Sequence, residues 1–390
     1  MRNRTIYSMS IGALLLAVCL CVAVLFDKSD NPSLPYSDIE GFTTIIEATD
    51  KSGVEAPADI VNNVRAVVLE ETEHSIIGHI DKMMYDRGRF YVLDRKMNKG
   101  IYVFNSEGSF LFNIGRVGRG HGEYIEPTDF VIADTLVLVL DEFGKKFVRY
   151  GLDGTYRGQK RLNAVFTNIA CTENGRLIMA KAGDNSNQNE LRDYELFQID
   201  IEGNILRKYY KNEYSMNFSA GNELVAFGDK IYYARALRPG VCEVDTSGFR
   251  MKYAFDFGNK NLPLDYERQS SGDYPRFLKR FENGYVYYTG SFIETSRYVG
   301  FAVHDGDKMN FYQVYDKDTG KSIIKPVGLL VDKGKIVRES LMYSSLNGIV
   351  DVKDDTVVSV VSPKRAFEAG FVTAGDSESN PVLLVMLFKR

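Results

Sequence analysis

Turn sequences recur along most of this chain at nearly even intervals. Five apolar segments each end in a polar turn closed by a glycine, and these glycines are Gly108, Gly154, Gly203, Gly248 and Gly320. The first four glycines are 46, 49 and 45 residues apart, and the next interval of 72 residues is long enough for one unit plus an insertion. A unit of about 40 to 50 residues built from short strands is typical of a β-propeller.

A second repeated pattern is a hairpin, in which an apolar strand, an acidic or glycine-containing turn and a strand rich in Tyr and Val follow one another. It occurs over residues 79–94, 128–141, 168–181, 223–236, 276–290 and 348–362. Glycine and Asp supply the positive φ or the side-chain hydrogen bonds that tight reversals need. Six such units predict an all-β fold, a six-bladed β-propeller over residues 60–390. A two-domain β-sandwich would not predict the same pattern six times.

The repeat region has one unpaired strand at each end. Residues 64–69 and 381–388 are apolar runs without a hairpin of their own. A ring of blades closes when one blade takes strands from both ends of the chain, so we predict that these two segments pair in the last blade. The 390 residues would otherwise suggest two or three domains at about 150 residues each.

The N-terminal segment predicts a membrane anchor or signal segment. Arg2 and Arg4 precede an uncharged run over residues 5–26. Twenty-two helical residues at about 1.5 Å each are long enough to cross a bilayer core, and the basic residues place the N-terminus in the cytoplasm. We therefore expect residues 1–26 to attach the protein to a membrane through residues 5–26. Residues 27–59 are expected to form a polar spacer, with the propeller in the periplasm or at the cell surface.

The processing of this segment and the state of the cysteines stay open. The alternatives are an uncleaved anchor, cleavage after Ala23 and lipidation at Cys19. Beyond the anchor, Cys171 and Cys242 lie in strand-like segments. A small buried side chain is the role expected there, and a disulfide is the alternative.

Five motifs occur in order along the repeat region: residues 69–82, 104–108, 114–124, 129–132 and 380–389. Together they resemble the six-bladed β-propeller proteins of the Bacteroidota cell envelope, an NHL-like and TolB-like family mostly of unknown function. The resemblance covers about residues 64–390 and implies a propeller exported to the cell envelope. His121 stands where that family usually has proline, and Val18 departs from its lipidation motif before Cys19.

The segment GRVGRGHGEY, residues 115–124, is the most unusual local sequence. Its four glycines let the backbone approach a partner closely. Its charged and hydrogen-bonding side chains are those of Arg116, Arg119, His121, Glu123 and Tyr124. One interpretation is a loop that binds an anion or a carbohydrate at a mouth of the central channel. The other is a connection between blades whose arginines pair with acidic neighbours.

Several kinds of chemistry are excluded. The chain has four histidines without the spacing of a zinc site, and it has neither a phosphate-binding Gly-Lys-Ser/Thr nor a Gly-x-Ser-x-Gly motif. The net charge of −4 gives no reason to expect a nucleic-acid partner. We therefore predict no catalytic residue, no metal ligand and no cofactor.

The function that this pattern favours is a ligand-binding or protein-interaction module of the cell envelope, with a glycan, a peptide or an envelope protein as its partner. The alternative is an enzyme similar to the propeller lactonases and lyases, which are hydrolases and lyases that hold Ca²⁺ in the central channel. Hard oxygen ligands suit that ion. The candidates at the start of hairpins are Asp81, Asp129, Asn168 and Glu223. A purely structural envelope component is a third interpretation.

Overall fold

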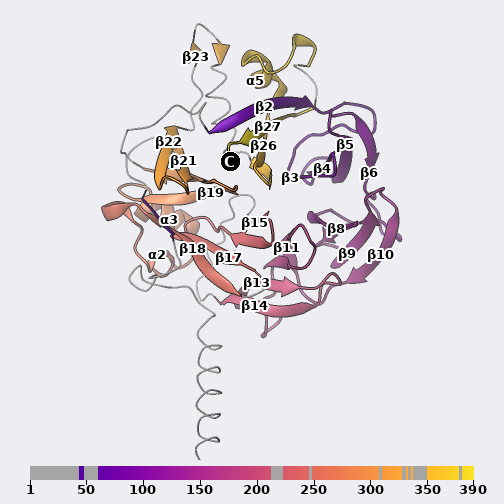
Figure 1. Cartoon of the computed structure of the whole chain (residues 1–390). Helices are drawn as coiled ribbons and strands as arrows, with labels where there is room; N and C mark the ends of the chain where they lie inside the picture. The colour runs from indigo at the N-terminus through magenta and orange to yellow at the C-terminus, as the bar shows by residue number, and fades with distance from the viewer. Residues whose placement is uncertain are drawn as a thin grey trace, which may run out of the picture.

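The computed structural model describes residues 44–47, 60–211, 223–245, 248–306, 310–326, 331–332, 335–336, 349–376 and 380–390. In this part of the chain, six sheets are arranged as blades around a common centre, as Figure 1 shows, and each contains four antiparallel strands, to which blade 4 adds a fifth. The six-bladed propeller that the repeats predict is therefore confirmed.

Within each blade the strands follow one another outward from the centre. Blade 1 contains β3 (Lys82–Asp86), β4 (Arg89–Asp94), β5 (Gly100–Asn105) and β6 (Phe110–Asn113). Blade 2 contains β7 (Asp129–Ala133), β8 (Leu136–Asp141), β9 (Lys146–Gly151) and β10 (Tyr156–Arg161). Blade 3 contains β11 (Phe166–Cys171), β12 (Ile178–Ala182), β13 (Tyr194–Ile199) and β14 (Ile205–Lys211).

The other half of the ring has the same plan. Blade 4 contains β15 (Leu224–Phe227), β16 (Lys230–Tyr233), β17 (Gly240–Val244) and β18 (Phe249–Asp256). Blade 5 contains β19 (Val286–Glu294), β20 (Tyr298–Asp305), β21 (Phe311–Asp316) and β22 (Lys321–Pro326). Blade 6 contains β25 (Ile349–Lys353), β26 (Thr356–Val361), β27 (Val382–Phe388) and β2 (Val61–Val68). The five glycine turns of the sequence lie between the third and fourth strands of blades 1 to 5, as the repeat predicts.

Aromatic side chains fill the spaces between neighbouring blades. Phe147 of blade 2 stacks on Phe166 of blade 3 with ring centroids 6.5 Å apart. Phe255 of blade 4 stacks on Phe301 of blade 5 at 4.1 Å. All four rings are fully buried. Since each sheet is covered on both faces by its neighbours, the Tyr and Phe content of the chain serves this packing.

The ring is closed by the pairing of the two ends of the described chain. β2 pairs antiparallel with β27, from Val61 opposite Phe388 to Val68 opposite Val382. The predicted closure is confirmed. Because β2 is the outer strand and β27 the third strand of blade 6, this blade cannot form from either end alone.

One predicted hairpin is wrong. Residues 276–290 do not form two strands, since α3 (Tyr274–Phe281) occupies the first half. Asp273 caps this helix by accepting a hydrogen bond from the Arg276 amide, and Phe277 and Phe281 are buried on one face. The helix lies in the insertion between blades 4 and 5 with η3 (Gly258–Lys260) and α2 (Tyr266–Ser270). The hairpin of blade 5 is instead formed by β19 and β20.

The remaining elements lie outside the regular blade pattern. β23 (Val331–Asp332) pairs with β24 (Lys335–Ile336), and α5 (Pro363–Glu368) and η5 (Ala374–Asp376) connect β26 to β27. β1 (Thr44–Glu47) pairs parallel with β18 as a fifth strand of blade 4. These four residues belong to the segment 27–59, for which a polar spacer and no strand was predicted.

Among the described residues, no helix is both long and apolar enough to cross a membrane. The predicted anchor, residues 1–26, lies outside the described residues. Cys171 and Cys242 are both free and buried, which confirms the expected structural role and excludes the disulfide between them. Burial raises the pKa of each thiol to about 12, so neither is a reactive thiolate.

Candidate functional site

The inner strands of the six blades enclose a central cavity of about 1260 Å³. Every blade contributes lining residues, through β3, β7, β11, β15, β19 and β25. Ligand-binding cavities in proteins commonly measure about 300 to 1,000 Å³, so this one has room for a small molecule or a short chain segment. We therefore take the cavity and its mouth as the candidate functional site.

An ion pair crosses the cavity wall between blades 1 and 2. The Lys82 ammonium lies 2.8 Å from Asp129 Oδ1 and donates to the carbonyl oxygen of Ile169 at 2.9 Å. The other oxygen of Asp129 accepts a hydrogen bond from the Ile169 amide at 2.8 Å. Both side chains are buried, at 13% and 2% exposure. The pair therefore links the inner strands of three blades, and Asp129 is neutralised by Lys82.

Asp351 on β25 also lines the cavity, and its half-buried carboxylate accepts a hydrogen bond of 2.8 Å from the Tyr85 amide. Burial raises its pKa to about 7, although the Tyr85 amide and the ammonium groups of Lys353 and Lys82 oppose the shift. The cavity thus contains a carboxyl group whose pKa lies near neutral pH. Asp351 was not among the predicted site residues, because nothing in the sequence shows which acidic residue of the last hairpin faces inward.

Two further polar side chains on the cavity wall have hydrogen-bonding groups available to a ligand. Asn168 on β11 and Thr289 on β19 are half-buried and line the cavity. Within the part of the chain that the structure describes, neither side chain has a hydrogen-bond partner. Amide and hydroxyl groups in this position can orient a ligand that carries its own donors and acceptors.

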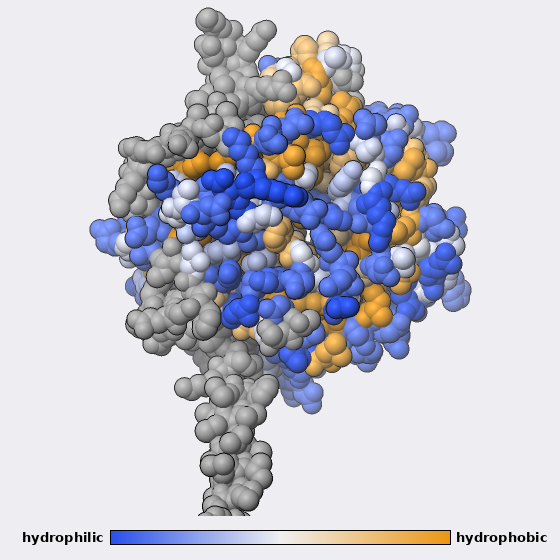
Figure 2. Space-filling view, in the orientation of Figure 1, coloured by the Kyte–Doolittle hydropathy of each residue, from blue (hydrophilic) through white to orange (hydrophobic). Residues whose placement is uncertain are grey.

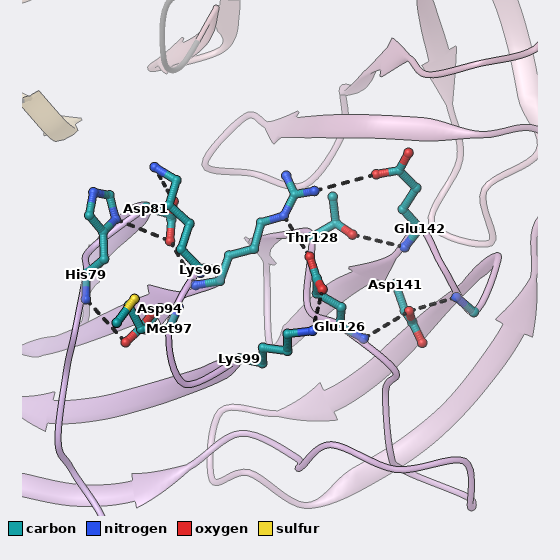
Figure 3. Close-up of polar contacts among 12 residues, drawn as sticks. His79, Asp81, Asp94, Lys96, Met97, Lys99, Glu126, Thr128, Asp141 and Glu142 are labelled. Atoms are coloured by element: carbon teal, nitrogen blue, oxygen red, sulfur yellow. Dashed lines mark hydrogen bonds and ion pairs between the residues drawn. The ribbon is translucent and has the colours of Figure 1, made fainter.

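The mouth of the cavity over blades 1 and 2 carries a network of ion pairs, shown in Figure 3. Asp81 lies 3.4 Å from His79 Nδ1 and 3.1 Å from the Lys96 ammonium. Burial opposes ionisation of Asp81, but Lys96 and the backbone amides of Arg95 and Lys96 outweigh it and lower its pKa. Asp81 is therefore an anion paired with the Lys96 ammonium, and the His79 ring lies on its other side.

The second half of this network is centred on Glu126. Its carboxylate lies 3.2 Å from Arg95 Nε and 2.9 Å from Lys99 Nζ, while Arg95 Nη2 is 3.9 Å from Glu142 (Figure 3). Burial opposes the ionisation of Glu126, but Lys99 and Arg95 outweigh it and lower its pKa. The pKa of Glu142, in contrast, is raised by burial. These contacts tie the mouth loops of the first two blades to each other.

The same turn supports the mouth in both blades. Asp94 and Asp141 stand at the ends of β4 and β8, and both are fully buried. Asp94 accepts hydrogen bonds from the amides of Gly78 and Met97, and Asp141 accepts them from Ile125 and Gly144. Each carboxylate thus fixes the chain that enters its blade against the turn between the second and third strands. The repeated Val-Leu-Asp of the sequence is the visible sign of this turn.

The glycine-rich loop 115–124 lies between blades 1 and 2 and is organised around Glu123. This carboxylate is 2.8 Å from Arg116 Nε and accepts a hydrogen bond of 2.7 Å from the Gly120 amide, and the Gly120 amide and Arg116 lower its pKa. Tyr124 is buried, and its hydroxyl donates to the carbonyl oxygen of Ile114. Arg119 and His121 are exposed.

The structure therefore brings together two of the five predicted loop residues, Arg116 and Glu123, and turns Tyr124 into the core. This arrangement matches the interpretation in which the loop connects blades and an arginine pairs with an acidic neighbour. Binding of a ligand by the exposed side chains of the loop stays a prediction.

The candidate Ca²⁺ ligands do not form a cluster. Asp81, Asp129 and Asn168 line the cavity, but Asp81 and Asp129 are each paired with a lysine. Glu223 pairs with Lys181 in the protein interior. In the described ranges, no group of three His, Cys, Asp or Glu side chains lies in a position to hold a metal ion.

These features define a six-bladed β-propeller with a central cavity lined by both polar and apolar side chains. Residues 44–386 match the family model "Domain of unknown function (DUF4934)", and the chain belongs to this family. The match begins at β1 and ends within β27. The comparison with curated proteins found no match.

Two solved structures share the fold. One is a Bacteroides fragilis protein described as a "putative exported protein", with 19% identity, a TM-score of 0.72 and coverage of 89% of this chain and all of the other. The second is a member of the DUF4221 family from Bacteroides vulgatus, with 12% identity, a TM-score of 0.53 and coverage of 85% of this chain and 97% of the other. At these identities the likeness concerns the fold alone.

Proposed function

We propose that the protein is an exported, membrane-anchored β-propeller of the cell envelope that binds a polar ligand in its central cavity. The observation that carries this proposal is the cavity of about 1260 Å³, into which Asn168, Thr289 and Asp351 present polar groups. The apolar segment over residues 5–26 and the structural likeness to a Bacteroides fragilis protein described as exported support the proposed location. The proposal includes membership of the NHL-like, TolB-like envelope propellers.

Recognition rather than catalysis fits the way the charges are arranged. The ionic groups of the wall are largely paired, as in Lys82 with Asp129 and Lys353 with Asp86 at 2.8 Å. The blades hold the wall rigid, so the ligand does not have to order it on binding. A ligand that carries hydroxyl or amide groups, such as a glycan fragment or a short peptide, matches the amide of Asn168 and the hydroxyl of Thr289.

The test is a thermal-shift screen of the full-length protein in detergent against mono- and oligosaccharides and di- to tetrapeptides. A compound that binds the folded state raises the Tm by mass action. The shift should disappear in Asn168→Leu and persist in Asn189→Leu, which makes the same change at an exposed loop position. A shift retained in a folded Asn168→Leu variant, or no shift with any compound, would contradict binding in the cavity.

The loop 115–124 is a second candidate contact for the same ligand class. Arg119 and His121 are exposed, and no hydrogen bond of either side chain is found within the described residues. If the loop contacts the ligand, Arg116→Ala with Arg119→Ala should weaken the shift without lowering the Tm of the free protein. A lower Tm of the free variant would assign these arginines to the support of the loop.

A further inference from the structure

Five large apolar side chains are exposed in the connections around the mouth of the cavity. They belong to the connections that lead into and through blades 1 and 2, and they are Ile76 (53% exposed), Met97 (66%), Val117 (52%), Ile125 (37%) and Phe143 (61%). Most exposed apolar residues of a monomeric protein are scattered singly, whereas a group of them marks an interaction surface. Figure 2 shows hydrophobic residues exposed between hydrophilic ones on the side of the molecule that blades 1 and 2 occupy in Figure 1.

Hydrogen bonds hold four of these residues in two pairs, and Val117 lies in the glycine-rich loop between the two blades. The Asn98 side chain donates to the Ile76 carbonyl oxygen at 2.8 Å, and Asp94 fixes Met97 against Gly78. In blade 2, Asp141 holds the Ile125 amide and the Gly144 amide, which follows Phe143. The ion pairs of Arg95 with Glu126 and Glu142 join the two halves. We call this group of five residues, with the basic side chains around it, the mouth patch.

The basic and acidic side chains of the mouth patch differ in their exposure to solvent. In three of its ion pairs the basic side chain is the exposed partner: Arg116 is 81% exposed against 18% for Glu123, Lys96 is 63% against 14% for Asp81, and Lys99 is 46% against 16% for Glu126. Arg119 and Lys145 are exposed as well. The acidic groups of these three pairs lie beneath the basic ones, so the surface around Met97 and the glycine-rich loop is positive and apolar.

We propose that the mouth patch docks an acidic polypeptide segment whose apolar side chains pack on Met97 and Phe143. Methionine and aromatic side chains are the anchors that protein interfaces favour, and exposed basic groups around them accelerate association with an acidic partner. The apolar part of the patch is separate from the cavity, since none of its five residues lines the cavity wall, whereas Lys96 lies at the edge that the two share.

A polypeptide fits this surface better than an anionic bilayer. Glu71 and Glu73 are exposed in the same connection as Ile76, Glu73 at 86%. A bilayer would bring a continuous layer of anionic headgroups against these two carboxylates. A peptide can place its acidic residues over Lys96, Lys99 and Arg119 alone and leave the two glutamates in solvent.

The experiment is selection from a phage-displayed library of random peptides on the full-length protein in detergent. We expect enriched peptides to combine Asp or Glu with Leu, Phe or Met. The most enriched peptide is then labelled, and its affinity is measured by fluorescence anisotropy. Raising NaCl from about 50 to about 500 mM should weaken binding, because exposed charges are screened.

Two patch variants test the location. Met97→Ser with Phe143→Ser, and separately Lys96→Glu with Arg119→Glu, should each lower the affinity about tenfold or more. The matched control is Leu111→Ser with Leu206→Ser, which changes two exposed leucines on outer strands and should leave the affinity within about twofold. Near-native Tm values of the variants exclude loss of fold as the cause.

Three results would overturn the proposal. One is a set of enriched peptides without an acidic bias, and another is unchanged affinity in both folded patch variants. The third is patch-dependent co-sedimentation of the protein with phosphatidylglycerol vesicles in the absence of peptide binding. That result would make a lipid surface the occupant. A loss of cavity ligands in Asn168→Leu without loss of peptide affinity would separate this site from the proposed function.

Discussion

The Asp351 carboxylate accepts a hydrogen bond of 2.8 Å from the Tyr85 amide, which lies 266 residues earlier in the chain. This contact joins the inner strand of blade 6 to that of blade 1. Asp129 makes the equivalent contact from blade 2 to the Ile169 amide of blade 3. The inner edge of each blade has backbone groups without a strand partner, and these two carboxylates satisfy amides of that kind.

The first prediction concerns the pH dependence that Asp351 imposes on stability. Its pKa is raised from 3.8 to about 7 on folding, so the folded state binds the proton more tightly. Stability from this group is therefore complete below about pH 3.8 and is lost as the pH rises to about 7. The Asp351→Asn variant has no carboxyl group here and should not show this loss. Its free energy of unfolding should therefore exceed that of wild type increasingly over this pH range, by at most about 4 kcal/mol.

Urea unfolding at a series of pH values measures the difference between the two proteins. Asp134→Asn changes an exposed carboxyl near the same end of the cavity and serves as the control. A wild-type to Asp351→Asn difference that does not vary with pH would show that water in the cavity keeps the carboxylate solvated.

The second prediction concerns ring closure. Asn380 is buried, and its side chain donates to the carbonyl oxygens of Ser75 and Glu70 and accepts from the Ile77 amide. Asn380→Ala should lower the free energy of unfolding by about 3 kcal/mol, since three hydrogen bonds are lost and buried groups are left unpaired. Deleting residues 380–390 removes β27 and should abolish the cooperative transition.

Urea unfolding followed by circular dichroism checks both changes. Asn189→Ala, at an exposed loop position, should stay within about 0.5 kcal/mol of wild type. A cooperative transition with unchanged midpoint in the deletion variant would mean that the ring is stable without the strand pairing that closes it.

Most of the fold could be predicted from the sequence because the repeated pattern lies within short segments of the chain. Turns and alternating strands recur within about 50 residues, and each depends on neighbouring residues only. The error over residues 276–290 has the same origin. Phe277 and Phe281 with the Asp273 cap fit a helix, but the following Glu-Asn-Gly resembles a hairpin turn, and local pattern alone did not decide between them.

Less of the candidate site could be predicted, because its contacts join residues that are far apart in the sequence. Of the four residues considered as Ca²⁺ ligands, Asp81, Asp129 and Asn168 line the cavity, whereas Glu223 does not. Their partners could not be inferred. Lys82 reaches a carboxylate on the next blade, and the Asp351 contact spans the ring closure. Such pairs depend on how the blades pack, which sequence periodicity does not encode.

The third prediction tests the pairing of Lys82 with Asp129. Lys82→Met leaves the Asp129 carboxylate buried without its cation and should cost about 3 to 5 kcal/mol. Adding Asp129→Asn should recover much of this loss, because the neutral amide oxygen still accepts from Ile169. A double-mutant cycle from urea unfolding gives the coupling energy. Simple additivity of the two single changes would show that the pair is not coupled.

The fourth prediction separates a binding module from a Ca²⁺ enzyme. Acidic residues of the cavity wall are ion-paired with lysines and do not converge on a common point. Asp129 pairs with Lys82, and Asp86 pairs with Lys353. We therefore expect the Tm to be the same with Ca²⁺ and with a chelator. A rise of the Tm with Ca²⁺ that the chelator reverses would instead support the hydrolase or lyase alternative.

The last prediction concerns the glycine-rich loop. Glu123→Ala removes the acceptor of the Gly120 amide and the partner of Arg116, so the Gly120 amide should exchange its hydrogen faster. The Tm should change little, because the buried Tyr124 still anchors the loop through its hydroxyl bond to Ile114.

Hydrogen-exchange mass spectrometry over residues 115–124 measures the effect. Tyr124→Phe is the matched change at the anchor, and it should lower the free energy of unfolding by about 1 kcal/mol because a buried hydrogen bond is lost. Arg119→Ala should alter neither exchange nor Tm, since the side chain only projects into solvent. If Arg119→Ala accelerates exchange as much as Glu123→Ala does, then Arg119 supports the loop and is not free to contact a ligand.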